Sequence, residues 1–423
     1  MTLHQLSFAL KPHHVQLSLA CLLSLVCACS NSLELETGEG SSRALTLNKS
    51  DSSQTLPSGM SCSAPAGGHD PNGLHDLSDG KVFEGWYYRV SDPERHASWV
   101  IITALWRDSA GDERAFVELI EGASGRAYRR VFEGPDEGVD LTRLSEGKGE
   151  FAFWIGAEDS LYLSPNLISG RFTSDQGDSV QIELEVEACA YWGDPKSSSD
   201  RWTMGWVTEL PGPPLKWHVH HLKGYASGEL RVNGELTRLK QLPLHQEKNW
   251  GRAFPSKWVW FQSNSFEGRP DVAIAGAGGP IFATDISPQG YMLGLRWQER
   301  FFSWRTQDGH RFKDVSFVVD HYQGLARWTM GVEGWLFRAD ITITAPVAGL
   351  IPIYVPSEGG LALEAVEHLA AELEIELYER APFGGEGVEG GWRKLDTMSS
   401  RLTAVEAGGS FAADEGLLVD EGH

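Results

Sequence analysis

Residues 370–380 read AAELEIELYER, and hydropathy along this stretch alternates with a period of two. Leu373, Ile375 and Leu377 are separated by glutamates at positions 372, 374 and 376. Successive side chains of a β-strand point to opposite faces, whereas a helix would group them every three or four residues. The stretch therefore predicts a strand with one buried face and one face in water.

Similar alternating or apolar runs recur from residue 76 onward, separated by turn residues at the spacing of all-β proteins. They include EGWYYRV (84–90), SWVIITALW (98–106), SVQIELEVEAC (179–189), KWVWFQSNSF (257–266) and EGWLFRADITIT (333–344). Asn233-Gly234 separates two more runs and strongly favours a two-residue β-hairpin. Because one small barrel cannot hold so many strands, we predict two β-barrels or sandwiches in tandem, joined near residue 243.

Composition agrees with this fold class and limits the partners. The chain has 423 residues, 16 of them Trp and 47 Gly, and 41% are hydrophobic, which is enough for a sizeable core. It carries 36 Lys and Arg against 58 Asp and Glu, a formal charge of −22. That excess of acid argues against nucleic acid and against docking on an anionic membrane through a basic face.

The first 28 residues have the features of an export signal. They contain no acidic residue, and VQLSLACLLSLVCA (15–28) is shorter than the ~20 residues that span a membrane. VCAC (26–29) resembles a bacterial lipoprotein cleavage box, which implies cleavage before Cys29 and lipidation of its thiol. Ser30 is not the Asp that retains lipoproteins at the inner membrane, so we expect the outer membrane of the cell envelope. An ordinary secretory signal cut nearby is the alternative.

The expected organisation is a signal peptide (1–28), a flexible tether (29–75), β-barrel domains (76–242 and 243–410) and an acidic tail (411–423). The tether is assigned from its Ser, Gly, Thr, Asn and Pro content. After loss of the leader, Cys62 and Cys189 remain as thiols and could form one disulfide, a question that the sequence leaves open. No Cys/His zinc spacing occurs.

Two aromatic stretches contain candidate site residues. In FEGWYY (83–88), Glu84, Trp86 and Tyr88 share one face of the expected strand, and Tyr87 lies on the other. A carboxylate beside Trp is unusual in a barrel interior; the alternative is an aromatic core strand with Glu84 at a solvated end.

The second stretch is HQEKNWG (245–251) followed by FPSKWVWFQSN (254–264). Trp258, Trp260, Gln262 and Asn264 alternate onto one face, which suggests the wall of a mixed pocket. The alternative is ordinary cross-strand packing with the amides at the rim.

One histidine cluster could suggest a metal, but the sequence favours no cofactor. In WHVHH (217–221), His218 and His220 point the same way on a strand, yet no third ligand is evident. A role of one histidine as a proton-relay partner is more consistent with this pattern. AIAGAGG (273–279) is followed by no helix, which argues against a dinucleotide site.

FEGWYYRV (83–90) and EKNWGRAFPSKWVWFQSNSFEG (247–268) strongly resemble the tocopherol cyclase family. Further matches follow in the same order: AIAGAGG (273–279), ARWTM (326–330), ELEIELYER (372–380) and MSSRLTAVEAGG (398–409). The resemblance covers essentially Asp76 to Gly409 and extends more distantly to the carotenoid hydratase-like group. It implies two tandem lipocalin-like β-barrel domains, in agreement with the all-β reading.

For chemistry, the resemblance implies closure of a prenylated quinol to a chromanol. An acid protonates an alkene and the neighbouring phenol captures the carbocation, without metal or redox cofactor. Glu247 and Glu84 are the carboxyls within the matched motifs, and an apolar barrel raises a carboxyl pKa. The indoles that could stabilise the cation are Trp86, Trp250, Trp258 and Trp260, and Tyr87 or Asn264 could position the phenol.

Within this set we expect Glu247 to be the principal acid, with Trp250 beside the developing cation. We also expect EKNWG to be the strand that enters the second barrel. The lipoprotein leader places the chain away from the compartment in which prenylquinols are made, so another isoprenoid is an open alternative. Two non-catalytic alternatives are a lipocalin-type carrier of a hydrophobic ligand and a structural envelope protein. A catalytic acid must face a cavity. Whether Glu84 or Glu247 does so therefore distinguishes the enzyme hypothesis from the carrier hypothesis.

The leader makes a direct prediction. Protein purified from its membrane fraction should lack residues 1–28 and carry an acylated Cys29, because the cleavage box directs both steps. Intact mass measurement checks this, and an unacylated chain beginning at another residue would contradict it.

Overall fold

The computed structural model describes residues 73–75, 77, 80–145, 152–193, 202–281, 287–381 and 387–418. The predicted signal peptide, Cys29, Cys62 and the side chain of Cys189 lie outside the described residues. In the described ranges nearly all regular structure is β-strand, and the α-helices are α1 (Leu141–Ser145) and α2 (Ser410–Asp414). None of the helices in these ranges has the length and hydropathy needed to cross a membrane.

The first sheet has ten antiparallel strands in the order β4-β3-β2-β1-β10-β9-β8-β7-β6-β5. Their bounds are β1 Val82–Asp92, β2 Ala97–Arg107, β3 Glu113–Glu121, β4 Arg126–Glu133, β5 Phe153–Ile155, β6 Ser160–Ser164, β7 Leu167–Thr173, β8 Ser179–Tyr191, β9 Leu215–Val232 and β10 Glu235–Gly251. The predicted hairpin is confirmed between β9 and β10, where Asn233 and Gly234 both have positive φ (50° and 86°), as a type I′ turn requires.

The second sheet follows the order β14-β13-β12-β11-β21-β19-β17-β16-β15, with β18 paired to β19 and β20 to β21. Its strands are β11 Lys257–Ser263, β12 Ala273–Pro280, β13 Gln289–Trp297, β14 Arg300–Arg305, β15 Arg311–Asp320, β16 Leu325–Glu333, β17 Phe337–Pro346, β18 Ile351–Ser357, β19 Gly360–Arg380, β20 Val388–Glu389 and β21 Trp392–Gly409. Short 3₁₀ turns are η1 (Pro135–Glu137), η3 (Gly205–Glu209), η4 (Thr306–Asp308) and η5 (Val347–Gly349).

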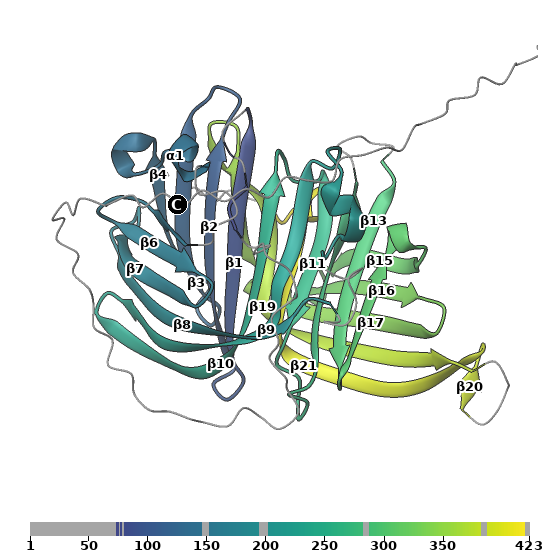
Figure 1. Ribbon diagram of the computed structural model, residues 1–423. Coiled ribbons are helices and arrows are strands. Elements are labelled where there is room, and N and C mark those ends of the chain that lie inside the picture. The colour runs from purple at the N-terminus through teal and green to yellow at the C-terminus, as the bar shows by residue number, and fades with distance from the viewer. Residues whose placement is uncertain are drawn as a thin grey trace, which may run out of the picture. The chain divides into compact units, whose positions relative to one another are not determined.

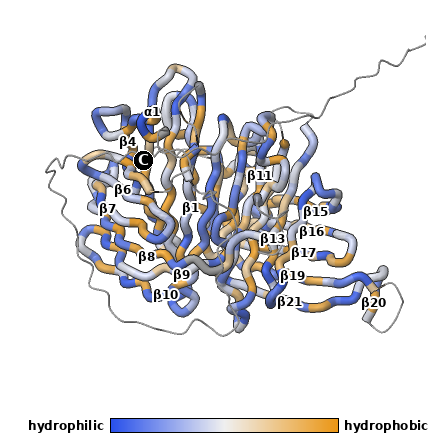
Figure 2. Tube along the Cα trace, in the orientation of Figure 1, coloured by the Kyte–Doolittle hydropathy of each residue, from blue (hydrophilic) through white to orange (hydrophobic). Residues whose placement is uncertain are grey.

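Each sheet curls into a half-barrel (Figure 1), so the prediction of an all-β, tandem lipocalin-like fold is confirmed. The period-two prediction is also confirmed, because Leu373, Ile375 and Leu377 are buried in β19 while Glu372 and Glu374 are exposed. Figure 2 shows apolar positions gathered along the strands of both sheets.

One expectation about the junction is wrong. EKNWG does not enter the second sheet, because β10 continues from the hairpin through Gly251 and pairs with β1 over residues 244–251. The second sheet begins only at Lys257. The division of the chain into domains at residue 243 stays a prediction.

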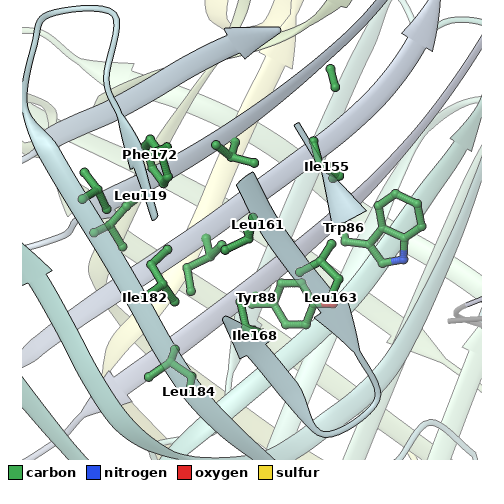
Figure 3. Close-up of a cluster of buried hydrophobic side chains, with 14 of the residues drawn as sticks. Trp86, Tyr88, Leu119, Ile155, Leu161, Leu163, Ile168, Phe172, Ile182 and Leu184 are labelled. Atoms are coloured by element: carbon green, nitrogen blue, oxygen red, sulfur yellow. The ribbon is translucent and has the colours of Figure 1, made fainter. Parts of the chain in front are cut away.

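The curved inner face of the first sheet is packed with side chains. Trp86 and Tyr88 of β1 lie there among leucines, isoleucines and Phe172 from the strands that curl around them (Figure 3). A second hydrophobic core is formed by side chains of the second sheet. A third core, which includes Trp258, Trp260 and Leu369, lies between the two sheets. Odd-numbered residues of β1 therefore face the second sheet, while even-numbered ones face the first core.

Arg89 connects the two sheets through hydrogen bonds. Its guanidinium is fully buried and donates from Nη1 to Gln262 Oε1 (3.1 Å), and from Nη2 to the carbonyls of Leu369 (2.7 Å) and Leu402 (3.1 Å). One side chain of β1 thus bonds to β11, β19 and β21.

Replacing Arg89 with Met should lower the free energy of unfolding by about 2–5 kcal/mol, because buried acceptors on three strands lose their donor. Urea denaturation measures the change. The control is Arg171→Met, at an exposed site on β7, which should change stability by no more than about 0.5 kcal/mol. Equal small losses in both variants would show that Arg89 does not hold the sheets together.

Candidate functional site

A cavity of about 190 Å³ lies at the junction of the two sheets. Four of the residues singled out from sequence line it from the junction side: Tyr87, Glu247, Trp258 and Trp260. Trp86 also borders it, although its ring packs in the first core. Most of the remaining lining is apolar, with Phe254, Met292 and Ile353 among it. Apolar surroundings with a few convergent polar groups are typical of sites for small hydrophobic molecules.

Glu247 is buried and faces the cavity from β10, opposite Tyr87 in the β1 register. Its Oε2 accepts a hydrogen bond from Trp260 Nε1 (3.0 Å) and lies 2.9 Å from His245 Nε2. Strand alternation places His245 on the same face two residues earlier. The carboxyl is therefore held in position by two rings from two different sheets.

Glu406 of β21 is a second carboxyl on the cavity wall, and sequence reasoning missed it. It lies opposite Trp260 in the β11–β21 register, and Trp258 Nε1 donates a hydrogen bond to its Oε1. Burial, reinforced by the charge of Glu247, raises the pKa of Glu406 to about 7. At neutral pH this carboxyl can both hold and release a proton.

Glu367 of β19 is a third acid, directly opposite Glu406 in the β19–β21 register. It is fully buried and accepts a 2.6 Å hydrogen bond from the Tyr87 hydroxyl. Burial, together with the neighbouring charge of Glu406, raises its pKa well above the ordinary value. Like charges directly opposite on neighbouring strands are destabilising, so this pair favours a state with at least one proton.

Sequence held a weak signal for these two acids. Glu406 lies within the matched motif MSSRLTAVEAGG, and Glu367 interrupts the apolar run ALEAVEHLAA. A carboxyl inside an apolar strand is unusual, but which sheet that strand faces is a tertiary property.

Glu84 does not line the cavity, and its surroundings favour the carboxylate. It is fully buried on the opposite face of β1, 2.5 Å from Lys248 Nζ and 2.8 Å from His75 Nδ1. Burial alone would raise its pKa, but the Lys248 ammonium and His75 lower it overall. Glu84 is therefore not suited to donate a proton at neutral pH, contrary to its selection from sequence as an acid.

This ion pair holds the end of the predicted tether against the first sheet. Lys248 Nζ donates to the carbonyl of Gly73, and Leu74 and Leu77 are buried in the first core. Trp250 lies on this face too, stacked on His75 with ring centroids 4.4 Å apart. Glu247 points to the other face of β10, so the expected pairing of Glu247 with Trp250 is wrong.

The predicted shared face of β11 is present, but its amides lie away from the cavity lining. Gln262 is bonded to Arg89, and Asn264 is fully buried just beyond the strand. The cavity wall on this strand is made by Trp258 and Trp260.

The histidines of β9 form a separate group. His220 and His221 both contact the Tyr191 ring, at a register irregularity that turns consecutive side chains the same way. His218 lies beside Thr203, with its ring 6.3 Å from that of His220. In the described part of the chain no three His, Cys, Asp or Glu side chains are grouped as metal ligands.

Comparison with known proteins agrees with the earlier resemblance. Residues 152–409, more than half of the chain, match the tocopherol cyclase-like family. The chloroplastic tocopherol cyclase of Zea mays is 25% identical over 379 residues, which cover 77% of this chain and 74% of that protein. A relative from Oryza sativa subsp. japonica is 24% identical over 375 residues (77% and 75%). The solved structure of kievitone hydratase from Nectria haematococca has a TM-score of 0.43, at 9% identity, over 80% of this chain and 92% of that one.

The raised pKa of Glu406 predicts a pH-dependent stability. A native pKa of about 7 against an ordinary 4.5 means that the folded chain keeps a proton that the unfolded chain releases. The free energy of unfolding should therefore fall as pH rises from about 4.5 to 7, and Glu406→Gln should remove up to ~1.4 kcal/mol per pH unit of that slope.

Urea denaturation between pH 4.5 and 8 gives the slopes. Glu374→Gln, on the exposed face of β19, is the control and should keep the wild-type slope. A Glu406→Gln slope equal to that of wild type would contradict the raised pKa.

Proposed function

Because the chain belongs to the tocopherol cyclase-like family, we propose that it closes a prenylated quinol, or a related isoprenoid bearing a hydroxyl, to a cyclic ether. The observation that supports this most is the position of Glu406, a carboxyl with a pKa of about 7 on the wall of an apolar, indole-lined cavity. General acid catalysis is most effective when the pKa of the acid is near the working pH.

In the proposed reaction Glu406 gives its proton to the less substituted carbon of the alkene. A tertiary carbocation forms, and Trp258, Trp260 and Tyr87 surround it with aromatic side chains, each worth up to roughly 2 kcal/mol when desolvated. The phenol oxygen then bonds to the cation. Every atom of the substrate is kept, so the reaction is an isomerisation.

The phenol proton must leave as the ring closes, and we assign its acceptor to Glu247. Its Oε2 is held by Trp260 and His245, and the residue faces the same cavity as Glu406. Transfer of that proton back to Glu406 restores the starting state. In this scheme Glu406 protonates the alkene, and Glu247, selected from sequence as the acid, instead accepts the phenol proton.

The carrier hypothesis explains less of the cavity. A carrier of an apolar molecule gains nothing from buried carboxyls, because burying them without a function costs free energy. We retain as proposals the lipoprotein anchor at Cys29 and location in the cell envelope, which would bring the protein close to lipid-dissolved substrates.

Turnover should depend on both carboxyls. Glu406→Gln and Glu247→Gln should each lower the rate about 10²–10⁴-fold while ligand binding persists, since each keeps the shape and loses one proton-transfer group. In wild type the rate should fall as pH rises through about 7, because Glu406 must be protonated. Retention time or fragmentation identifies the product, since cyclisation leaves the mass unchanged.

The control is again Glu374→Gln, which should retain full turnover. If Glu406→Gln is fully active and Glu247→Gln is not, Glu247 is the acid, as the sequence alone suggested. If wild type binds prenylquinols and forms no cyclic product from any of them, the protein is a carrier.

A further inference from the structure

A second, larger cleft lies outside the junction between the sheets. It encloses about 860 Å³, and its floor includes Phe302, Trp304 and Phe337 of the second sheet. Phe302 and Trp304 stack with centroids 5.4 Å apart. One rim is the 3₁₀ turn η3, and the other is the turn between β16 and β17, residues 334–336.

The two rims carry large apolar side chains that remain in water. Trp206 is 57% exposed and Leu210, just past η3, is 41% exposed, while Trp335 and Leu336 on the opposite turn are 84% and 64% exposed. These four side chains are half of the large exposed hydrophobic residues in the described ranges. Exposed apolar groups gathered in this way mark an interaction site, whereas single ones are ordinary.

The backbone below each rim is fixed. Arg305 donates from Nε to the carbonyl of Thr203 (2.7 Å) and from Nη2 to that of Trp202 (3.0 Å). Arg380 Nε donates to the carbonyl of Trp335 (2.7 Å). Exposed side chains on a fixed backbone are preorganised for binding, because little conformational entropy of the backbone is lost when a partner binds.

The cleft shares a wall with the cavity at the junction of the two sheets. Along one short segment, Met204 and Val207 line the cavity, whereas Gly205 and Trp206 line the cleft. A molecule in the cleft is thus separated from the cavity by a single turn of chain.

The charges of the cleft disfavour an anionic partner. Arg305, a basic residue in its lining, is paired with Asp308 at 2.9 Å, and Glu209 adds a negative charge. Among the described residues, no lysine lines the cleft. Together with the formal charge of −22, this disfavours anionic lipid and nucleic acid and leaves an uncharged apolar surface as the partner.

We propose that Trp206, Leu210, Trp335 and Leu336 dock the protein on the surface of a zwitterionic lipid bilayer, with the cleft open toward the lipid. Indole side chains favour the headgroup region, where their ring is apolar and their N–H stays hydrated. Passage of substrate from the bilayer across η3 into the cavity rests on the proposed function. Docking itself does not.

Hydrogen exchange of the full-length chain, with and without phosphatidylcholine vesicles, tests the docking. Amides of residues 203–211 and 333–338 should exchange about tenfold more slowly with vesicles. A lipid anchor alone holds the chain at the vesicle without covering these two turns. Trp206→Ser with Trp335→Ser should abolish the protection, whereas Trp154→Ser, which removes an indole of 53% exposure on β5, should not change it.

A second measurement separates docking from catalysis. Turnover of a prenylquinol dissolved in vesicles should fall at least tenfold in the double variant through a higher apparent KM, while turnover in detergent micelles stays at the wild-type rate. Absence of turnover in both media would count against the proposed function and leave the exchange result valid.

Three outcomes would overturn the docking proposal. One is that vesicles leave both turns unprotected. Another is protection without vesicles that grows with protein concentration, which would assign the surface to a second copy of the chain. The third is protection with phosphatidylglycerol vesicles alone, because the proposal assigns the surface to a zwitterionic bilayer.

Discussion

The buried guanidinium of Arg89 is the constraint on which the rest of this structure depends. It is a permanent cation in a region of low dielectric, bonded to one strand through Gln262 and to two others through their carbonyls. Three acids, Glu247, Glu367 and Glu406, lie in the same region; Glu406 and Glu247 raise the pKa of Glu367, and Glu247 raises the pKa of Glu406. Arg89 can balance one carboxylate, and every further negative charge there is uncompensated. Burial is the main cause of the raised pKa values of Glu367 and Glu406, and the neighbouring carboxylates raise both pKa values further.

The junction also explains where chemistry can take place in this fold. Lipocalin-like barrels commonly bind ligands inside, but here the inner face of the first sheet is filled by the cluster around Trp86 and Tyr88 (Figure 3). The outer faces of the two half-barrels meet instead and leave a small cavity between them. Strand β1 serves both regions at once. Its even-numbered residues face the first core. Tyr87 and Arg89, on the opposite face of the strand, contribute polar groups to the junction.

Sequence predicted the parts of this arrangement that depend on neighbouring residues. The Glu/Leu alternation of β19, the Asn-Gly hairpin and the orientation of Trp258 and Trp260 follow from strand geometry alone. Glu247 was found because it lies in a recognisable motif. Trp250 was paired with it wrongly, although an odd separation of three residues on a strand already places the two side chains on opposite faces. Glu367 and Glu406 could not be paired from sequence, because they lie 39 positions apart and their contact depends on the register between β19 and β21. Period two shows which residues share a face, and only tertiary packing shows what that face meets.

Strand β10 also determines how this protein can evolve. Adjacent residues of the strand serve opposite purposes, since Glu247 faces the cavity while Lys248 neutralises Glu84 on the reverse side. Gain or loss of a single residue between positions 245 and 250 would exchange these two faces, placing an ammonium at the cavity and a second carboxylate beside Glu84. This strand can tolerate single substitutions one at a time, but it cannot tolerate insertions or deletions. Length variation among descendants of this chain should therefore accumulate in the connections between strands, and the spacing of the motif from His245 to Trp250 should persist after its individual letters have changed.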